Sequence, residues 1–163
     1  MKLASLSEGV RSLTSLRDLI ISNCPELTSL PQSIQCLSSL RFLGIYLCQR
    51  LASLPNEIQH LALLSELKIY DCSNLTLLPR GMRNLSALQT LRIKGCPHLE
   101  KERGEDWPNI AHIPSIQILR KVDTDIETTH SYYRKQNGKV KNNYPRVYTD
   151  RFAVAGSTDK RKY

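Results

Sequence analysis

The chain has 163 residues, of which 40% are hydrophobic and 23% are charged, and its formal net charge is +8. This length and composition suit one folded domain with a tail. No apolar run approaches the roughly 20 residues that a membrane-spanning helix needs, so no membrane span is predicted. The charge is uneven, because residues 1–116 carry a net charge of +2 and residues 117–163 carry +6. The basic character therefore belongs mainly to the C-terminal part.

Residues 1–99 repeat a single pattern every 24 residues. The skeleton Cys-x-x-Leu-x-x-Leu-Pro, which begins at Cys24, returns at Cys48 and at Cys72, and the chain opens in the middle of a unit. A period between roughly 20 and 29 residues with Leu-x-x-Leu-x-Leu inside it is the signature of a leucine-rich-repeat solenoid. We therefore predict an α/β fold with parallel strands on the concave face, short helical or 3₁₀ turns on the convex face, and a C-terminal extension.

Each unit contains a segment that alternates with period 2, as expected for a short strand. In the first such segment, Leu19 and Ile21 are predicted to point into the solenoid. Asp18, Ile20 and Ser22 are predicted to point out from the sheet. The Leu-Pro-x-x-Ile segment of each unit suits a short helix or 3₁₀ turn, because proline at the first helical position loses no hydrogen bond. One unit cannot bury its own apolar side, so neighbouring units must stack.

The outward strand positions are the candidate binding surface, because solenoid proteins bind partners on the concave sheet. Their chemistry changes from unit to unit while the leucines stay constant. Phe42, Tyr46 and Tyr70 form an outward aromatic group, and aromatic residues with nearby arginine anchor many protein interfaces. The alternative is that these aromatic residues only suit strands. The candidate partner-binding residues are Asp18, Ile20, Ser22, Phe42, Tyr46, Glu66, Lys68, Tyr70, Arg92 and Lys94.

Four of the five cysteines, Cys24, Cys48, Cys72 and Cys96, occupy one column of the repeat. Strands lie roughly 4.8 Å apart, so this column spans about 14 Å and cannot gather around one tetrahedral zinc ion. A disulfide between neighbours is not sterically excluded. We expect small, buried, reduced thiols at the turn after each strand. Cys36 falls in a column of varying chemistry and is expected to face water.

Motifs typical of enzymes are missing from the sequence. It holds no phosphate-binding loop, dinucleotide-binding glycine pattern, zinc-protease motif or nucleophile elbow. We therefore expect no enzymatic activity and assign no catalytic, cofactor-binding or metal-binding residue. The N-terminus does not read as a secretory signal, so the expected location is the cytoplasm or the nucleus.

The segment 100–116 is predicted to cap the repeats, since no further leucine-rich strand is predicted after Leu99. Trp107 begins a series of apolar residues spaced three apart that can cover the end of the stack, while the charged residues before it stay solvated. The tail, residues 117–163, loses the period and is expected to be flexible. Two alternatives remain for the tail: contact with single-stranded nucleic acid, and a small partner-binding hairpin at Asn137-Gly138.

The repeat, with its Leu-Pro-x-x-Ile, resembles that of plant intracellular immune receptors of the nucleotide-binding, leucine-rich-repeat family. Glu105-Asp106-Trp107-Pro108 and His112-Ile113-Pro114 resemble the end of the repeat region in the coiled-coil class of these receptors. The resemblance covers about residues 3–116. It implies recognition of a pathogen effector or of a guarded host protein. Because no phosphate-binding loop is present, the expectation is a truncated relative, or a C-terminal fragment, that lacks the nucleotide-binding domain.

Two other classes of protein remain open. An intracellular leucine-rich-repeat scaffold of the Ras-associated kind shares Leu-Pro-x-x-Ile, and the Trp-Pro segment favours the immune receptor over it. A nucleic-acid binder acting through the basic tail is the third class and is not the expected one. The predicted partner is therefore a protein.

Overall fold

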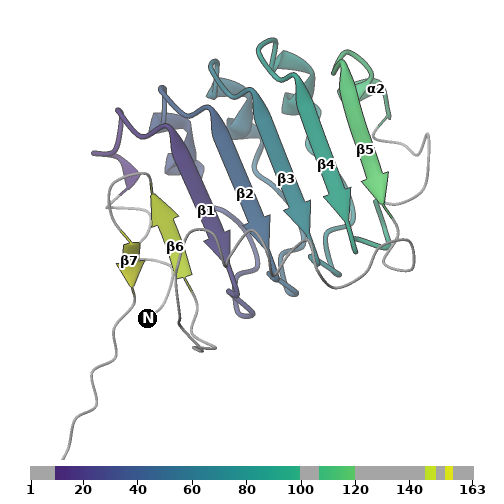
Figure 1. The fold of residues 1–163 in the computed structure, drawn as a ribbon, viewed down its shortest axis with the longest axis horizontal. Coiled ribbons are helices and arrows are strands. Elements are labelled where there is room, and N and C mark those ends of the chain that lie inside the picture. The colour runs from purple at the N-terminus through teal and green to yellow at the C-terminus, as the bar shows by residue number, and fades with distance from the viewer. Residues whose placement is uncertain (1–9, 100–106, 120–145, 150–152, 156–163) are drawn as a thin grey trace, which may run out of the picture.

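The computed structural model describes residues 10–99, 107–119, 146–149 and 153–155. These residues form a seven-stranded sheet in the order β5-β4-β3-β2-β1-β6-β7 (Figure 1). The strands are β1 (Asp18–Ser22), β2 (Phe42–Tyr46), β3 (Glu66–Tyr70), β4 (Thr90–Lys94), β5 (Ser115–Leu119), β6 (Arg146–Thr149) and β7 (Ala153–Ala155).

The first five strands are parallel and pair in a constant register. Leu19 lies opposite Leu43, which lies opposite Leu67, and the step between partners in β1 to β4 is the 24-residue period of the sequence. Because successive side chains of a strand point to opposite faces, a constant step stacks like residues in rows. The inner rows are fully buried, with Leu43 and Leu67 at 0% exposure. The predicted α/β leucine-rich-repeat solenoid is confirmed.

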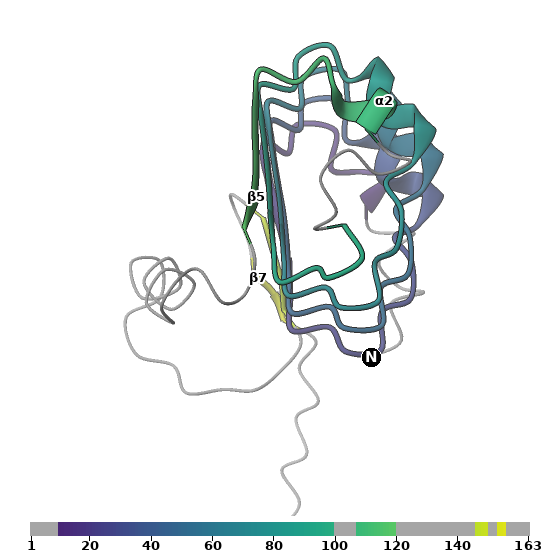
Figure 2. The same ribbon diagram turned by 90° about the vertical axis from the view of Figure 1, so that its right-hand side faces the viewer.

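Three 3₁₀ turns form the side of the molecule opposite the sheet: η1 (Gln32–Cys36), η2 (Asn56–His60) and η3 (Arg80–Asn84) (Figure 2). Each follows a proline that is the N-cap and has extended backbone, for example Pro55 with φ −71° and ψ 149°. The prediction placed the prolines at the first helical position, and the structure moves them one residue earlier. The fixed φ of proline suits this extended position as well, and the missing N–H still costs nothing.

A residue with positive φ directly follows each of the strands β1 to β4. Its N–H donates to the carbonyl oxygen of the last residue of the next strand, as from Leu47 to Tyr70 over 3.0 Å. This left-handed residue turns the chain sharply inward, which brings the following cysteine into the core. Glycine, asparagine and aspartate tolerate such a φ, and leucine does so poorly. The residues are Asn23 (φ 52°), Leu47 (φ 55°), Asp71 (φ 55°) and Gly95 (φ 64°).

The cysteine column is buried, as the repeat predicted, and Cys36 is half-buried. None of the five cysteines, all of which lie in the described part of the chain, forms a disulfide bond. Each column thiol donates to the carbonyl oxygen two residues before it, over 3.4 Å from Cys24 and 3.5 Å from Cys96. Hydrogen bonds with Cys48 and then Cys96, together with burial, raise the pKa of the Cys72 thiol. The Cys72 thiol is therefore a protonated core side chain.

The expectation that the strands end before residue 100 is wrong. β5 pairs with β4 in parallel, and the short helix α2 (Trp107–Ile110) packs beside η3, so residues 107–119 form one more unit. Isoleucine replaces leucine in this unit and the step is 25 residues. The predicted boundary at residue 116 therefore falls inside a strand. Corresponding residues are Leu85 and Ile110, Leu88 and Ile113, Leu91 and Ile116, and Ile93 and Ile118.

Trp107 starts this last unit and packs, partly buried, against the hydrophobic core. The inner residues of β5 are less covered than those of the strand before it. Ile116 and Ile118 are half-buried, whereas Leu91 and Ile93 are buried. The charged residues 100–106 that were expected to stay solvated lie outside the described residues.

Part of the tail belongs to the sheet. β6 runs antiparallel to β1, with Tyr148 opposite Ile20, and β7 runs antiparallel to β6 (Figure 1). The expectation of a flexible extension is therefore wrong for these two strands. Strand pairing at this position satisfies backbone groups of β1 that an open edge would leave unpaired. The remaining tail residues, including Asn137-Gly138, lie outside the described residues.

Within the described part of the chain, no helix has the length and apolar character needed to cross a membrane.

Candidate protein-binding surface on the outer sheet face

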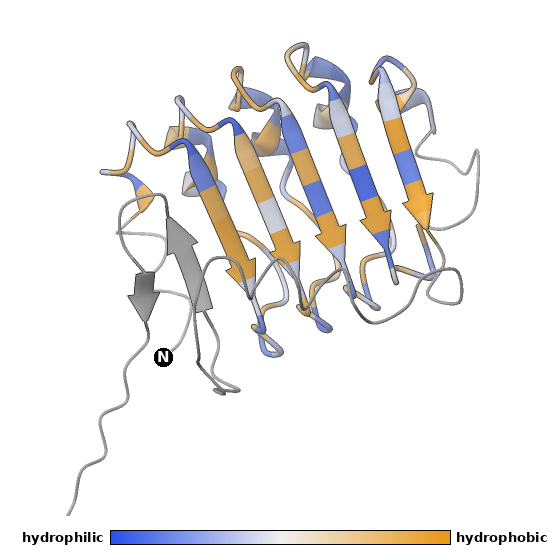
Figure 3. Cartoon of the chain, viewed as in Figure 1, coloured by the Kyte–Doolittle hydropathy of each residue, from blue (hydrophilic) through white to orange (hydrophobic). Residues whose placement is uncertain are grey.

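The outer sheet face is the side of β1 to β5 that points away from the buried leucines, and it is the concave face of a leucine-rich-repeat solenoid. All ten predicted binding residues lie on it, because the register aligns their positions across the strands. Figure 3 shows hydrophobic and hydrophilic residues alternating along β3 and β4. The three outward rows are Asp18, Phe42, Glu66, Thr90 and Ser115; Ile20, Gly44, Lys68, Arg92 and Gln117; and Ser22, Tyr46, Tyr70, Lys94 and Leu119.

Three of the predicted residues offer little surface to a partner. Ser22, Tyr46 and Lys94 are exposed by only 4%, 3% and 9%. The Tyr46 ring folds back over Gly44, where an added Cβ would come within 2.5 Å of the tyrosine Cε2. The same ring meets Tyr70 edge to face, with the ring centroids 5.4 Å apart. Tyr46 therefore serves the structure of the face instead of projecting from it.

The predicted aromatic group is divided by these contacts. Tyr46 and Tyr70 form one pair, whereas Phe42 lies under the ammonium group of Lys68, with the nitrogen 5.0 Å from the ring centroid. Such a cation–π contact stabilises both side chains in a fixed position. The aromatic rings thus hold each other and Lys68 in place across β2 and β3.

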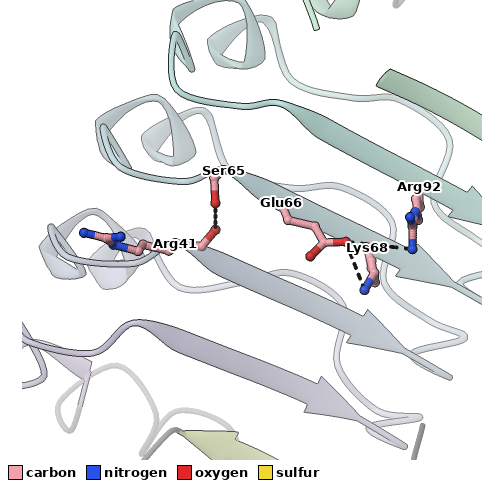
Figure 4. Close-up of polar contacts among 5 residues, drawn as sticks. All are labelled: Arg41, Ser65, Glu66, Lys68 and Arg92. Atoms are coloured by element: carbon pink, nitrogen blue, oxygen red, sulfur yellow. Dashed lines mark hydrogen bonds and ion pairs between the residues drawn. The ribbon is translucent and has the colours of Figure 1, made fainter. Parts of the chain in front are cut away.

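Glu66 is the centre of a charged cluster on β3 and β4 (Figure 4). Its Oε1 lies 3.0 Å from Lys68 Nζ and 3.9 Å from Arg92 Nη1. The side chains of Glu66 and Arg92 are exposed by 33% and 38%, and that of Lys68 by 12%. One carboxylate is therefore shared between two cations at the surface.

Two cationic groups of the cluster are incompletely paired. The Nε of Arg92 is buried and has no hydrogen-bond partner within the described residues. The ammonium group of Lys94 forms no ion pair there either. Buried N–H groups normally have a partner, and leaving one without costs about 1 to 3 kcal/mol. β3 and β4 together present three cations against one carboxylate, so this part of the face is positively charged.

Burial changes the pKa of one residue on this face, Tyr70. Desolvation raises the pKa of the Tyr70 phenol, and the positive charge of Arg92 opposes part of that rise. The phenol is therefore neutral at physiological pH and can both donate and accept a hydrogen bond. It lies beside the cations without adding charge to them.

Sequence reasoning placed Gly44 on this face but missed its structural role, and it missed the outward residues of β5. Gly44 stands in the middle of a strand, which signals close approach by another group, here the Tyr46 ring. Ser115 and Gln117 extend the outward rows onto β5, and the spacing of the isoleucines on either side of them was the available signal.

Within the described residues, no group of three or more histidine, cysteine, aspartate or glutamate side chains could hold a metal ion.

No protein-family model matches the chain, and no curated protein matches it. Among solved structures, a leucine-rich-repeat protein of Leptospira interrogans is similar at 21% identity with a TM-score of 0.40. The likeness covers 58% of this chain and 29% of that one, so this chain corresponds to less than a third of that protein. Independently of this likeness, the parallel strands at a constant step, the 3₁₀ turns and the buried rows define a leucine-rich-repeat solenoid. This fold presents its sheet as an extended surface suited to protein partners.

Proposed function

We propose that the chain is a non-catalytic protein-recognition module whose outer sheet face binds its partner. This proposal rests on the difference in residue variation between the two faces of the same strands. The inner rows hold leucine or isoleucine in every unit, whereas the outer rows change from aromatic to acidic to basic. A surface whose side chains vary on a constant frame suits selective binding.

We further propose that this module serves plant immune recognition, in which the partner is a pathogen effector or a guarded host protein. The support is the resemblance of the repeats and of the segment that contains Trp107-Pro108 and His112-Ile113-Pro114. In the structure this segment closes against the last repeats, and His112 Nε2 lies 3.3 Å from the carbonyl oxygen of Leu85. Reduced, buried cysteines are compatible with the proposed location in the cytoplasm or nucleus.

Site-specific photo-crosslinking tests the recognition proposal. A benzophenone amino acid is placed at Phe42 on the outer face or, as the matched control, at the exposed Gln35 of η1. In an extract of infected plant tissue, we expect a discrete crosslinked protein from position 42 and none from position 35. Equal crosslinking from both positions, or from neither, would contradict the proposed role of the face.

A further inference from the structure

We propose that the partner presents an acidic polypeptide segment to β3 and β4, and that a carboxylate of this segment takes over the contacts now made by Glu66. This inference rests on the proposed recognition function and specifies the chemistry of the partner.

Cationic residues outnumber carboxylates on β3 and β4. Lys68 and Arg92 share the carboxylate of Glu66 at unequal distances of 3.0 and 3.9 Å. The longer distance leaves the contact with Arg92 weak. A partner carboxylate beside Arg92 would meet a partly exposed guanidinium group that Glu66 pairs only weakly.

The contact with Glu66 uses only part of the Arg92 guanidinium group. A guanidinium group binds a carboxylate best through two parallel N–H groups, and a Glu66 oxygen lies near only one terminal nitrogen. The Nε–H of Arg92 is buried without an acceptor within the described residues. A partner carboxylate cannot reach this buried atom, but it can bind the two terminal nitrogens through two parallel N–H groups. Glu66 contacts one terminal nitrogen only, so the stronger mode of binding, through two parallel N–H groups, stays open to a partner.

Nucleic acid also binds basic surfaces that carry aromatic side chains. Binding of single strands depends on aromatic faces that are free to stack on bases. Here Lys68 covers the ring of Phe42, and the Tyr46 ring lies over Gly44 with Tyr70 at its side. A polypeptide carboxylate fits this surface better than a nucleotide chain.

Fluorescence anisotropy with a fluorescein-labelled hexaglutamate peptide tests the inference on the full chain at low salt. We expect measurable binding that weakens as salt rises, because the contact is electrostatic. Arg92→Gln should weaken binding by about tenfold, a typical effect of removing a contacting charge. Glu66→Gln should strengthen it by roughly three- to tenfold, since Lys68 and Arg92 then lose their internal competitor.

The matched control is Glu26→Gln. Glu26 is exposed, lies outside the strands and pairs with Arg50 at 2.6 Å, so its substitution changes the net charge by the same amount at another place. We expect no more than a small change from it. If Glu66→Gln and Glu26→Gln have equal effects, only the net charge matters and the site is refuted. Thermal unfolding of each variant shows whether it remains folded, and the gain of binding by Glu66→Gln cannot arise from loss of fold.

Two further outcomes separate this inference from its alternatives. If a labelled ten-residue oligo-dT binds more tightly than the peptide and responds in the same way to Arg92→Gln and Glu66→Gln, the ligand is nucleic acid and the acidic-peptide inference is overturned. If position 42 crosslinks a protein but the peptide shows none of the expected responses, the recognition function stands and the acidic partner is refuted. If the peptide responds as expected but no protein crosslinks, the acidic site is supported and the proposed function fails.

Discussion

The inner and outer rows of the sheet come from the same strands but obey different constraints. In β3, Leu67 and Ile69 are fully buried and have leucine or isoleucine as partners in the adjacent strands. On the other side of the same strand, Glu66, Lys68 and Tyr70 are partly exposed and differ from their neighbours. The inner rows decide whether the chain folds, so the outer rows are free to differ in charge and shape. This separation predicts which substitutions affect stability and which affect binding.

The largest loss of stability is expected from Leu67→Ala. The side chain is fully buried in the middle of the stack, and truncation there costs about 2 to 5 kcal/mol of unfolding free energy. Urea unfolding followed by circular dichroism measures the change. Lys68→Ala, one residue further on the outer face, is the control and should cost less than about 1 kcal/mol. Similar midpoints for the two variants would remove the distinction between the rows.

Trp107→Ala should cost less than Leu67→Ala, because Trp107 is only partly buried at the end of the stack. We expect a loss of about 1 to 3 kcal/mol, the scale of burying one large apolar side chain. Intrinsic fluorescence provides a second check, since Trp107 is the only tryptophan. Its emission should shift to longer wavelength on unfolding. An unchanged melting temperature in the variant would show that Trp107 does not hold the last unit.

Leu47→Asn should stabilise the protein by about 1 kcal/mol, because leucine is strained at positive φ and asparagine is not. Asn23 occupies the equivalent position after β1. The reverse exchange, Asn23→Leu, should therefore destabilise by a similar amount. Thermal unfolding of both variants measures the pair. A loss of stability in Leu47→Asn would mean that the leucine side chain makes contacts that outweigh the backbone strain.

The smallest effect is expected from the titration of Tyr70. Burial raises its pKa above the usual value of about 10, so the folded state favours the neutral phenol. The resulting stabilisation is fully present below pH 10 and is lost as the pH rises through the folded pKa, because the unfolded chain releases the proton first. As the pH rises from 9 to 11, the free energy of unfolding of Tyr70→Phe should therefore fall by less than that of the wild type. Chemical unfolding at each pH tests this, and parallel curves would contradict it.

The sequence predicted the repeats well because each inner row appears as a column of leucines at a fixed step. β5 was missed because isoleucine replaces leucine there and the step lengthens by one residue. The position of β6 had no local signal, since it depends on backbone pairing with β1, more than a hundred residues earlier. The outer residues were placed on the correct face from strand alternation alone. Burial of Tyr46 was missed because it depends on the space above Gly44 and on contact with Tyr70.

The most direct test of the account is to measure stability and partner affinity in one variant, Arg92→Ala, against the protein crosslinked from position 42. The account predicts at least a tenfold loss of affinity, equivalent to about 1.4 kcal/mol, because Arg92 acts on the outer face. It predicts a change of less than about 1 kcal/mol in unfolding free energy, because the inner rows are intact. Unchanged affinity, or a loss of affinity that is matched by a loss of fold, would contradict the separation of recognition from folding.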